Sequence, residues 1–212
     1  MSSLPFFNHV KTFSGYHYDR SRPDDDLIFK KKFSGNWAEE LTRFTPPTLR
    51  TSPDLENKYT RLQIQEWMEL GWNMNTHNGK NPLDERFPTL QKIDSYFDFD
   101  EKQSYLTQQN PFEMLPYHHD VLGSNNIPIE DVLDRGWRFL VFLTDWEPGQ
   151  FIIYGNTTID KWEAGYILGW PAVKYPHGTA NVSHYTAYRL RINGLITQNI
   201  IDFVNCNKVI DI

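Results

Sequence analysis

Residues 137–154 read WRFLVFLTDWEPGQFIIY, two runs of aromatic and β-branched residues on either side of a short segment that contains Pro148 and Gly149. Such runs are typical of strands, and Pro and Gly between them are typical of a turn. Similar runs recur before and after this stretch, separated by Gly, Pro, Asn and Asp. The pattern predicts strands at residues 112–117, 137–146, 150–154, 157–162, 165–170, 172–177 and 185–196.

This spacing of strands bears on the fold class. Several short strands close together predict an antiparallel sandwich or barrel. No helical pattern long enough for a crossover lies between them, which disfavours a doubly wound parallel sheet. We therefore expect a mainly β protein of one structural domain, with residues 111–196 as its core.

The chain before residue 111 has a different character. Prolines and charge clusters interrupt it, so we expect loops and short elements there. One helix is predicted over residues 52–72, because Ser-Pro-Asp-Leu-Glu supplies start signals and Gly71 lies where the helix would end. Residues 1–110 are interpreted as an N-terminal extension that packs on the core, and residues 197–212 as a C-terminal segment.

Composition excludes several classes of protein. Of the 212 residues, 39% are hydrophobic and 23% charged, which is typical of a globular chain. The net charge of -6 argues against a protein that follows the phosphates of a nucleic acid. Cys206 is the single cysteine, so a disulfide framework and a zinc site of paired thiolates are excluded. No apolar run reaches the roughly 18 residues of a membrane helix, and the first residues lack a signal-peptide pattern, so we expect a soluble cytoplasmic protein.

The first candidate site is the pair His118 and Asp120 at the end of the strand predicted at 112–117. Residues two apart on a strand point the same way, so this imidazole and this carboxylate can converge on one metal ion. A third ligand from His177, at the end of the 172–177 run, would give two histidines and one carboxylate on adjacent strands. That facial triad leaves coordination positions open and suits Fe(II), although the same donors also suit zinc and manganese.

Three stretches, taken together, resemble the Fe(II)- and 2-oxoglutarate-dependent dioxygenases of the double-stranded β-helix (jelly-roll) fold. They are LPYHHD at residues 115–120, WRFLVFLTDWEPGQ at 137–150, and WEAG at 162–165 leading into HGTAN at 177–181. The similarity is greatest to small bacterial and phage-type members and spans residues 112–194. It implies a jelly-roll core with an N-terminal extension of loops and helix, an Fe(II) cofactor and 2-oxoglutarate as cosubstrate.

The resemblance also implies roles for single residues. His118, Asp120 and His177 match the iron ligands, and Asn181 matches a position often near the cosubstrate. The family usually holds the far carboxylate of 2-oxoglutarate with a basic residue, but the usual spacing falls here on Ala187. The two arginines with the same strand parity are the candidates, Arg189 first and Arg191 second, and a hydroxyl from Tyr154 is a further candidate.

The implied activity is hydroxylation of an unidentified small molecule or protein side chain, with release of succinate and CO₂. Two alternatives stay open. A cupin-like metalloprotein with the same triad but no 2-oxoglutarate would suit the displaced arginine. A non-enzymatic jelly-roll binding module would suit the many aromatic residues. Neither a membrane nor a nucleic acid is expected as a partner.

Overall fold

The computed structural model describes residues 27–45, 79–118, 129–172, 174 and 176–212. The helix expected at 52–72 lies outside the described residues, and so do His119 and Asp120.

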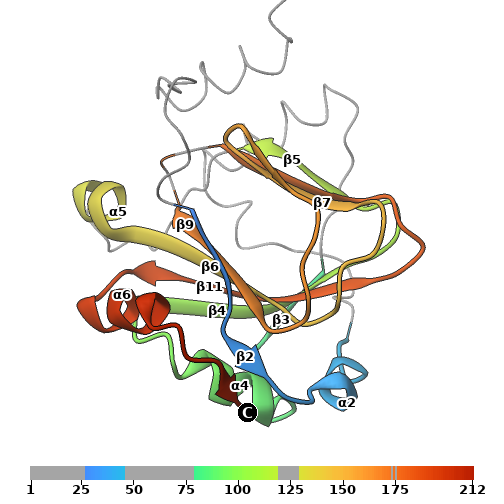
Figure 1. The fold of residues 1–212 in the computed structure, drawn as a ribbon, viewed down its shortest axis with the longest axis horizontal. Coiled ribbons are helices and arrows are strands. Elements are labelled where there is room, and N and C mark those ends of the chain that lie inside the picture. Colours follow the sequence, from blue (N-terminus) through green and yellow to red (C-terminus); the bar gives the residue numbers. More distant parts are fainter. Residues whose placement is uncertain (1–26, 46–78, 119–128, 173, 175) are drawn as a thin grey trace, which may run out of the picture.

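Two antiparallel sheets form the body of the described protein, one above the other (Figure 1). The larger sheet has the strand order β1-β9-β6-β11-β4-β3 and the smaller one β5-β10-β7-β8. The larger sheet consists of β1 (Ile28–Lys31), β9 (Tyr166–Pro171), β6 (Gly136–Phe142), β11 (Ala187–Leu195), β4 (Asp100–Gln109) and β3 (Gly79–Pro82). The smaller sheet consists of β5 (Met114–His118), β10 (His177–Asn181), β7 (Gln150–Tyr154) and β8 (Thr157–Ile159). The prediction of a mainly β jelly roll is confirmed.

Side chains of the larger sheet alternate between two apolar clusters. On β6, Phe139 and Val141 belong to the cluster on the outer face of the sheet, whereas Leu140 and Phe142 belong to the cluster between the sheets. Successive side chains of a strand point to opposite faces, so a strand that is covered on both sides needs apolar residues at every position. This accounts for the unbroken run FLVF in the sequence.

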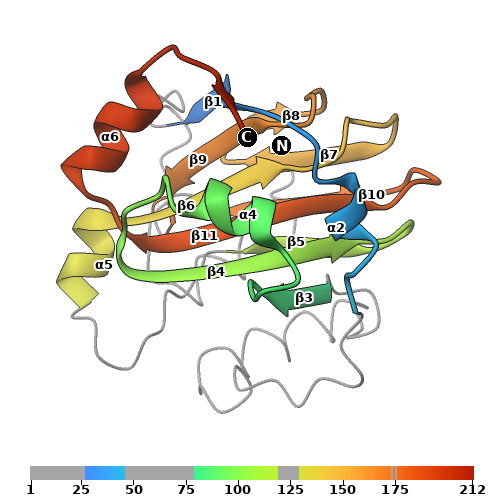
Figure 2. The same ribbon diagram turned by 90° about the horizontal axis from the view of Figure 1, so that it is seen from below.

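Helices cover the outer face of the larger sheet. Figure 2 shows α4 (Pro88–Asp94) in front of that sheet, with α6 (Gln198–Asn205) beside it. Leu90 and Ile93 of α4 are fully buried in the outer cluster, together with Ile200 of α6. Two further short helices are α2 (Ala38–Leu41) and α5 (Ile129–Arg135).

Segments from the two halves of the chain also meet in a small parallel ladder. β2 (Phe33–Ser34) pairs with β12 (Ile210–Asp211). Next to it, the buried Lys32 donates hydrogen bonds from its Nζ to the backbone oxygens of Cys206 and Lys208, just beyond the end of α6. A cation near the last carbonyls of a helix is favourable, because those oxygens carry the negative end of the helix dipole.

Several expected boundaries need correction. The strand at 150–154 is found as predicted. The strand expected at 172–177 is instead β10, which begins at His177 and ends at Asn181. The strand expected at 157–162 ends at Ile159. Within the part expected to hold loops and short elements, β4 is a strand of 10 residues in the larger sheet. The charged start of β4, Asp100 to Lys102, hides it from a search for apolar runs, since this end is exposed.

Candidate metal centre and arginine pocket

His118 and His177 lie directly opposite each other in the register of β5 and β10. Their ring centroids are 4.5 Å apart, and the rings are inclined by 51°. Both are buried, with 7% and 4% of their surface exposed. Two imidazoles from residues far apart in sequence are thus side by side at the end of the smaller sheet.

The hydrogen bond of His118 determines which ring nitrogen is available to a metal. Nδ1 of His118 lies 2.6 Å from the backbone oxygen of Pro116. A carbonyl oxygen can only accept, so Nδ1 carries the proton and donates it. In the neutral ring, Nε2 then holds the lone pair that a metal requires, and the bond to the carbonyl fixes the ring as outer partners of metal-bound histidines usually do.

A similar argument holds for His177. Nη1 of Arg138 lies 3.3 Å from Nε2 of His177, and a guanidinium can only donate hydrogen bonds. Nε2 of His177 is therefore the acceptor and carries the lone pair of this ring, which the N–H of Arg138 contacts. Asn193 holds the arginine in place, because its Oδ1 accepts from Nε of Arg138 at 2.8 Å. The two imidazoles thus present donors of the kind that Fe(II), zinc and manganese bind.

The third ligand stays a prediction. Asp120 follows His118 by two residues, but it lies outside the described residues. Within the ranges that the structure describes, no group of three or more His, Cys, Asp or Glu side chains is placed to hold a metal ion. The described part of the site therefore supplies two of the three donors that the sequence predicts.

A pocket between the two sheets opens beside His177. Its cavity volume is about 50 Å³. Three arginines line it, Arg138 from β6 and Arg189 and Arg191 from β11. No acidic residue is among the described residues that line this pocket. The other lining residues are Thr107, Leu115, Leu140, Ile152, Trp170, Gly178 and Thr179. Such a pocket favours an anion over a neutral ligand or a cation.

Arg189 is the most deeply buried of the three arginines that line the pocket. Only 3% of its surface is exposed, and burial lowers the pKa of its guanidinium to about 10. Nη1 donates to Oε1 of Gln109 at 2.8 Å, while Nε and Nη2 have no hydrogen-bond partner among the described residues. A buried charge with unused donors is costly without a ligand, and a carboxylate is the group that fits a guanidinium fork.

The depth of Arg189 relative to His177 suits a short dicarboxylate. Gln109 Oε1 also accepts from Oγ1 of Thr179 at 3.1 Å, so the arginine reaches the level of Thr179 on β10. Thr179 is one inward step from His177, which corresponds to about 6.6 Å along a strand. We call the depth of the pocket at which His177 lies the histidine level. A ligand that reaches from the histidine level to Arg189 must therefore span a distance of about this size.

The other expected cosubstrate residues have different positions. Arg191 also lines the pocket and lies over the ring of Tyr105, with 5.2 Å from its Cζ to the ring centroid. Tyr154 is fully buried, is paired with His177 across β7 and β10, and packs against Trp170 at 5.7 Å between ring centroids. Both positions keep these residues near the histidine level of the pocket.

Asn181 is placed elsewhere. It lies at the opposite end of β10 from His177, and its amide donates to the backbone oxygens of Gln109 and Tyr185. Its Oδ1 accepts from the hydroxyl of Ser183. These bonds satisfy a buried amide inside the turn between β10 and β11, so Asn181 holds that turn and is not among the residues that line the pocket.

Sequence reasoning missed Arg138 and Gln109. Arg138 shares strand parity with the inward Leu140 and Phe142, so the alternation along β6 was the signal that could have found it. Gln109 gave no such signal, because β4 was not predicted as a strand. Only the pairing of β4 with β11 brings Gln109 next to Arg189.

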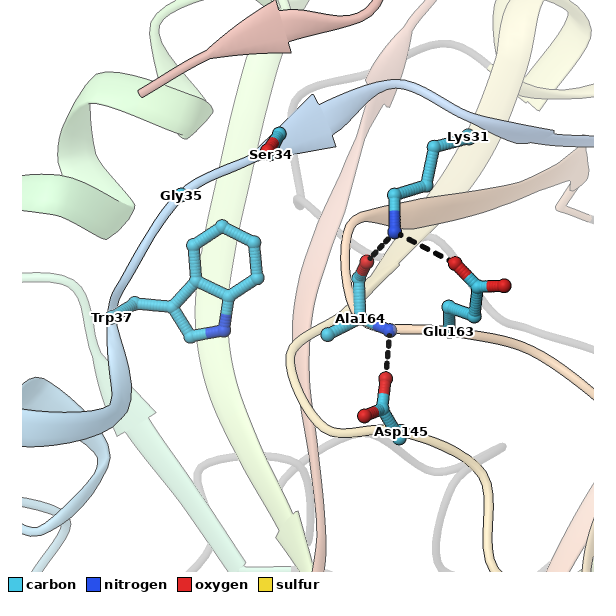
Figure 3. Close-up of a pocket in the computed structure, with 7 residues that line it drawn as sticks. All are labelled: Lys31, Ser34, Gly35, Trp37, Asp145, Glu163 and Ala164. Atoms are coloured by element: carbon cyan, nitrogen blue, oxygen red, sulfur yellow. Dashed lines mark hydrogen bonds and ion pairs between the residues drawn. The ribbon is translucent and has the colours of Figure 1, made fainter.

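A second pocket, with a cavity volume of about 270 Å³, lies beside β1 and the turn before β9 (Figure 3). Nζ of Lys31 forms an ion pair with Glu163 at 3.2 Å and also donates to the backbone oxygen of Ala164. Asp145 Oδ1 accepts from the backbone N–H of Ala164 at 2.8 Å. These charged groups are engaged with one another and with the backbone, so the geometry favours a structural role that ties the turn to β1.

Comparisons with known proteins give a weak structural likeness. No protein-family model matches the chain, and no curated protein matches it. A Pseudomonas putida prolyl-4-hydroxylase is 12% identical with a TM-score of 0.46, and the match covers 81% of this chain and 93% of that one. A cupin superfamily protein from Desulfitobacterium hafniense DCB-2 is 16% identical with a TM-score of 0.35, over 57% of this chain and 79% of that one. A Cupin 2 conserved barrel domain protein from Salinispora arenicola is 8% identical with a TM-score of 0.36, over 76% and 98%.

Because these structural likenesses are weak, the assignment of a jelly-roll fold rests on the strand order and register of the protein itself. No helix in the described part of the chain is long and apolar enough to span a membrane.

Proposed function

We propose that this protein is an Fe(II)- and 2-oxoglutarate-dependent oxygenase that hydroxylates a small molecule or a protein side chain. The observation that carries the proposal is the pairing of His118 with His177, both with Nε2 as acceptor, beside a pocket lined by three arginines. His118, His177 and the predicted ligand Asp120 would hold the metal. With O₂ as the oxidant, bound Fe(II) and 2-oxoglutarate would supply the oxidising chemistry, in which one oxygen atom goes to the succinate formed with CO₂ and the other to the substrate.

The residues of the chain itself have three tasks in this proposal. The hydrogen bond from His118 to Pro116 orients the imidazole of His118, and the pairing of β5 with β10 places the ring of His177 beside it. Arg189 binds the far carboxylate of 2-oxoglutarate, because its guanidinium has donors left over in a buried place. Apolar side chains between the sheets, among them Leu140, Ile152 and Trp170, keep water away and so strengthen these contacts.

The proposal is tested by a titration of the metal-free full-length chain under anaerobic conditions. Fe(II) and 2-oxoglutarate, added together, should bind at one equivalent each and produce a weak visible absorption band. On admission of O₂, slow release of succinate should follow even without a substrate, and it can be followed by proton NMR. His184→Ala is a matched control, because His184 is an exposed histidine in the turn between β10 and β11.

The same titration separates the alternatives. Binding of Fe(II) with no response to 2-oxoglutarate would reject the oxygenase and favour the cupin-like metalloprotein. Absence of metal binding, together with glycan binding that survives a chelator, would favour the non-enzymatic module. Both results would contradict the proposal.

A further inference from the structure

The contact between Arg138 and His177 uses the same lone pair that a metal would need. Nη1 of Arg138 donates to Nε2 of His177 at 3.3 Å, and the neutral ring has one lone pair at that nitrogen. A metal bound through Nε2 and this N–H cannot both be present. Arg138 therefore occupies, as a cation, the side of His177 that a metal cation would take.

The contact is built into the fold. Arg138 is 7% exposed and lies opposite Asn193 in the register of β6 and β11. The 2.8 Å hydrogen bond from its Nε to Asn193 Oδ1 directs the rest of the guanidinium toward β10. Arginine stays protonated at any ordinary pH, so an approaching metal meets both an occupied lone pair and a positive charge.

A bound anion would give Arg138 a stronger acceptor than His177. Arg138 lines the pocket together with Arg189 and Arg191, and the described lining contains no carboxylate. A carboxylate at the histidine level would offer two oxygens to the guanidinium fork, and such a charged acceptor binds it more strongly than a neutral imidazole nitrogen does. The carboxylate would also offset the repulsion between the arginine and the metal.

We infer that Arg138 couples the two ligands of this site, so that the protein binds its metal weakly until a 2-oxo acid carboxylate draws Arg138 away from His177. The inference rests on the proposed function, since it concerns the same metal and cosubstrate. Coupling of this kind is reciprocal, so metal and 2-oxoglutarate must raise the affinity for each other by the same factor. The metal-free protein would then discriminate against metal ions that arrive without the cosubstrate.

The test uses Mn²⁺, which replaces Fe(II) without oxidation, and measures its dissociation constant calorimetrically with and without saturating 2-oxoglutarate. In Arg138→Met the competing N–H and charge are gone. Mn²⁺ should then bind about 10-fold more tightly than in the wild type when 2-oxoglutarate is absent, the effect of one lost hydrogen bond and one lost repulsion. The enhancement by 2-oxoglutarate should shrink by a similar factor.

Three further variants test whether the change in Mn²⁺ affinity comes from the contact between Arg138 and His177. Arg138→Lys keeps the charge and should retain much of the weak binding of Mn²⁺ without 2-oxoglutarate. Asn193→Ala removes the acceptor that directs Arg138 and should change Mn²⁺ affinity in the same direction as Arg138→Met, but less. Arg135→Met is the matched control, because Arg135 forms an ion pair with Asp100 outside the pocket and should leave both affinities unchanged.

The outcomes distinguish this inference from the proposed function. If the wild type binds Mn²⁺ and 2-oxoglutarate, but Arg138→Met and Asn193→Ala leave the Mn²⁺ affinity unchanged or weaken it, the coupling role is wrong and the oxygenase stands. If the wild type binds no Mn²⁺ with or without 2-oxoglutarate, the metal site itself is wrong and both fall.

Discussion

At the scale of single residues, Arg189 combines a binding role with a cost in stability. Its guanidinium is buried, keeps two nitrogens without hydrogen bonds to described residues, and has its pKa lowered to about 10 by burial. The folded-state pKa lies below its ordinary value, so the unfolded chain holds this proton more tightly. The charge therefore destabilises the ligand-free fold at all pH values below about 10, and the penalty fades as the pH rises from there toward the pKa of the unfolded chain.

Replacing Arg189 should separate these two effects. In Arg189→Met the charge is replaced by an apolar side chain of similar length, so the ligand-free protein should be equally stable or more stable by about 1–3 kcal/mol at neutral pH. The apparent dissociation constant for 2-oxoglutarate should rise about 30-fold or more, because a buried carboxylate loses its partner. Urea unfolding and calorimetric titration measure the two quantities.

The variant Arg191→Met tests whether Arg191, in place of Arg189, binds the far carboxylate of 2-oxoglutarate. Arg191→Met should change 2-oxoglutarate affinity by less than about 1 kcal/mol if Arg189 is the anchor. A large loss in Arg191→Met with a small one in Arg189→Met would move the anchor two residues along β11, toward the level of His177. A fall in stability of several kcal/mol in Arg189→Met would show that the charge is better compensated than its contacts indicate.

At the scale of elements, Gly165 lies in the turn before β9 and holds that turn against the backbone of Lys32 and Phe33. Its backbone oxygen accepts from the N–H groups of Lys32 and Phe33 at 3.0 Å each, and its own N–H donates to the backbone oxygen of Phe142. Its φ is +87°, and an added Cβ would lie 1.9 Å from the backbone oxygen of Phe33. No side chain fits between these backbones, so only glycine allows Phe33 of β2 to lie this close to the turn before β9.

We expect Gly165→Ala to destabilise the protein by more than about 3 kcal/mol, since strain at positive φ and a backbone clash combine. Thermal unfolding followed by circular dichroism measures the change. Gly155→Ala is the comparison, because Gly155 also has a positive φ of 55°. That value lies near the left-handed minimum, which alanine tolerates at a cost of about 1–2 kcal/mol. Equal losses in the two variants would contradict the role of the Phe33 contact.

At the scale of the whole molecule, the larger apolar cluster and the candidate site lie on opposite faces of the larger sheet. The outer cluster, where helices α4 and α6 meet the larger sheet, contains 18 buried residues of the described part of the chain, among them Phe97, Phe139 and Leu190. His177 and the arginines lie on the inner side, where they line the pocket, and His118 lies beside His177. Stability should therefore depend mainly on the helix-covered face, and the site can hold buried polar groups because other parts of the fold support them.

This separation predicts that loss of the metal ligands leaves the fold intact. His118→Ala, Asp120→Ala and His177→Ala should each abolish Fe(II) binding at stoichiometric metal, while the unfolding temperature of the metal-free protein changes by only a few degrees. His119→Ala should bind Fe(II) normally, since its side chain is expected on the opposite face of the strand. If His119→Ala lost the metal and His118→Ala kept it, the assignment of the ligand would be wrong by one position.

The sequence by itself determined the class of fold and the candidate chemistry of the site. Apolar runs such as FLVF and the Pro-Gly turn at 148–149 are local signals, and they predicted β6 and β7 because burial on both faces of a strand needs apolar residues at successive positions. The prediction that His118 and Asp120 converge on one metal ion uses the same local kind of signal, since residues two apart on a strand share a face, and it stays a prediction for Asp120.

Only the tertiary structure decided which residues meet. The register that places His118 opposite His177, the membership of β4 in the larger sheet, and the contacts of Arg138 with Asn193 and of Arg189 with Gln109 all join strands that are distant in sequence. Pairing between distant strands depends on the packing of both faces and on the path of the connections, which no local window of sequence contains. A one-residue slip would turn every such side chain to the other face, so the site exists only in the assembled sheets.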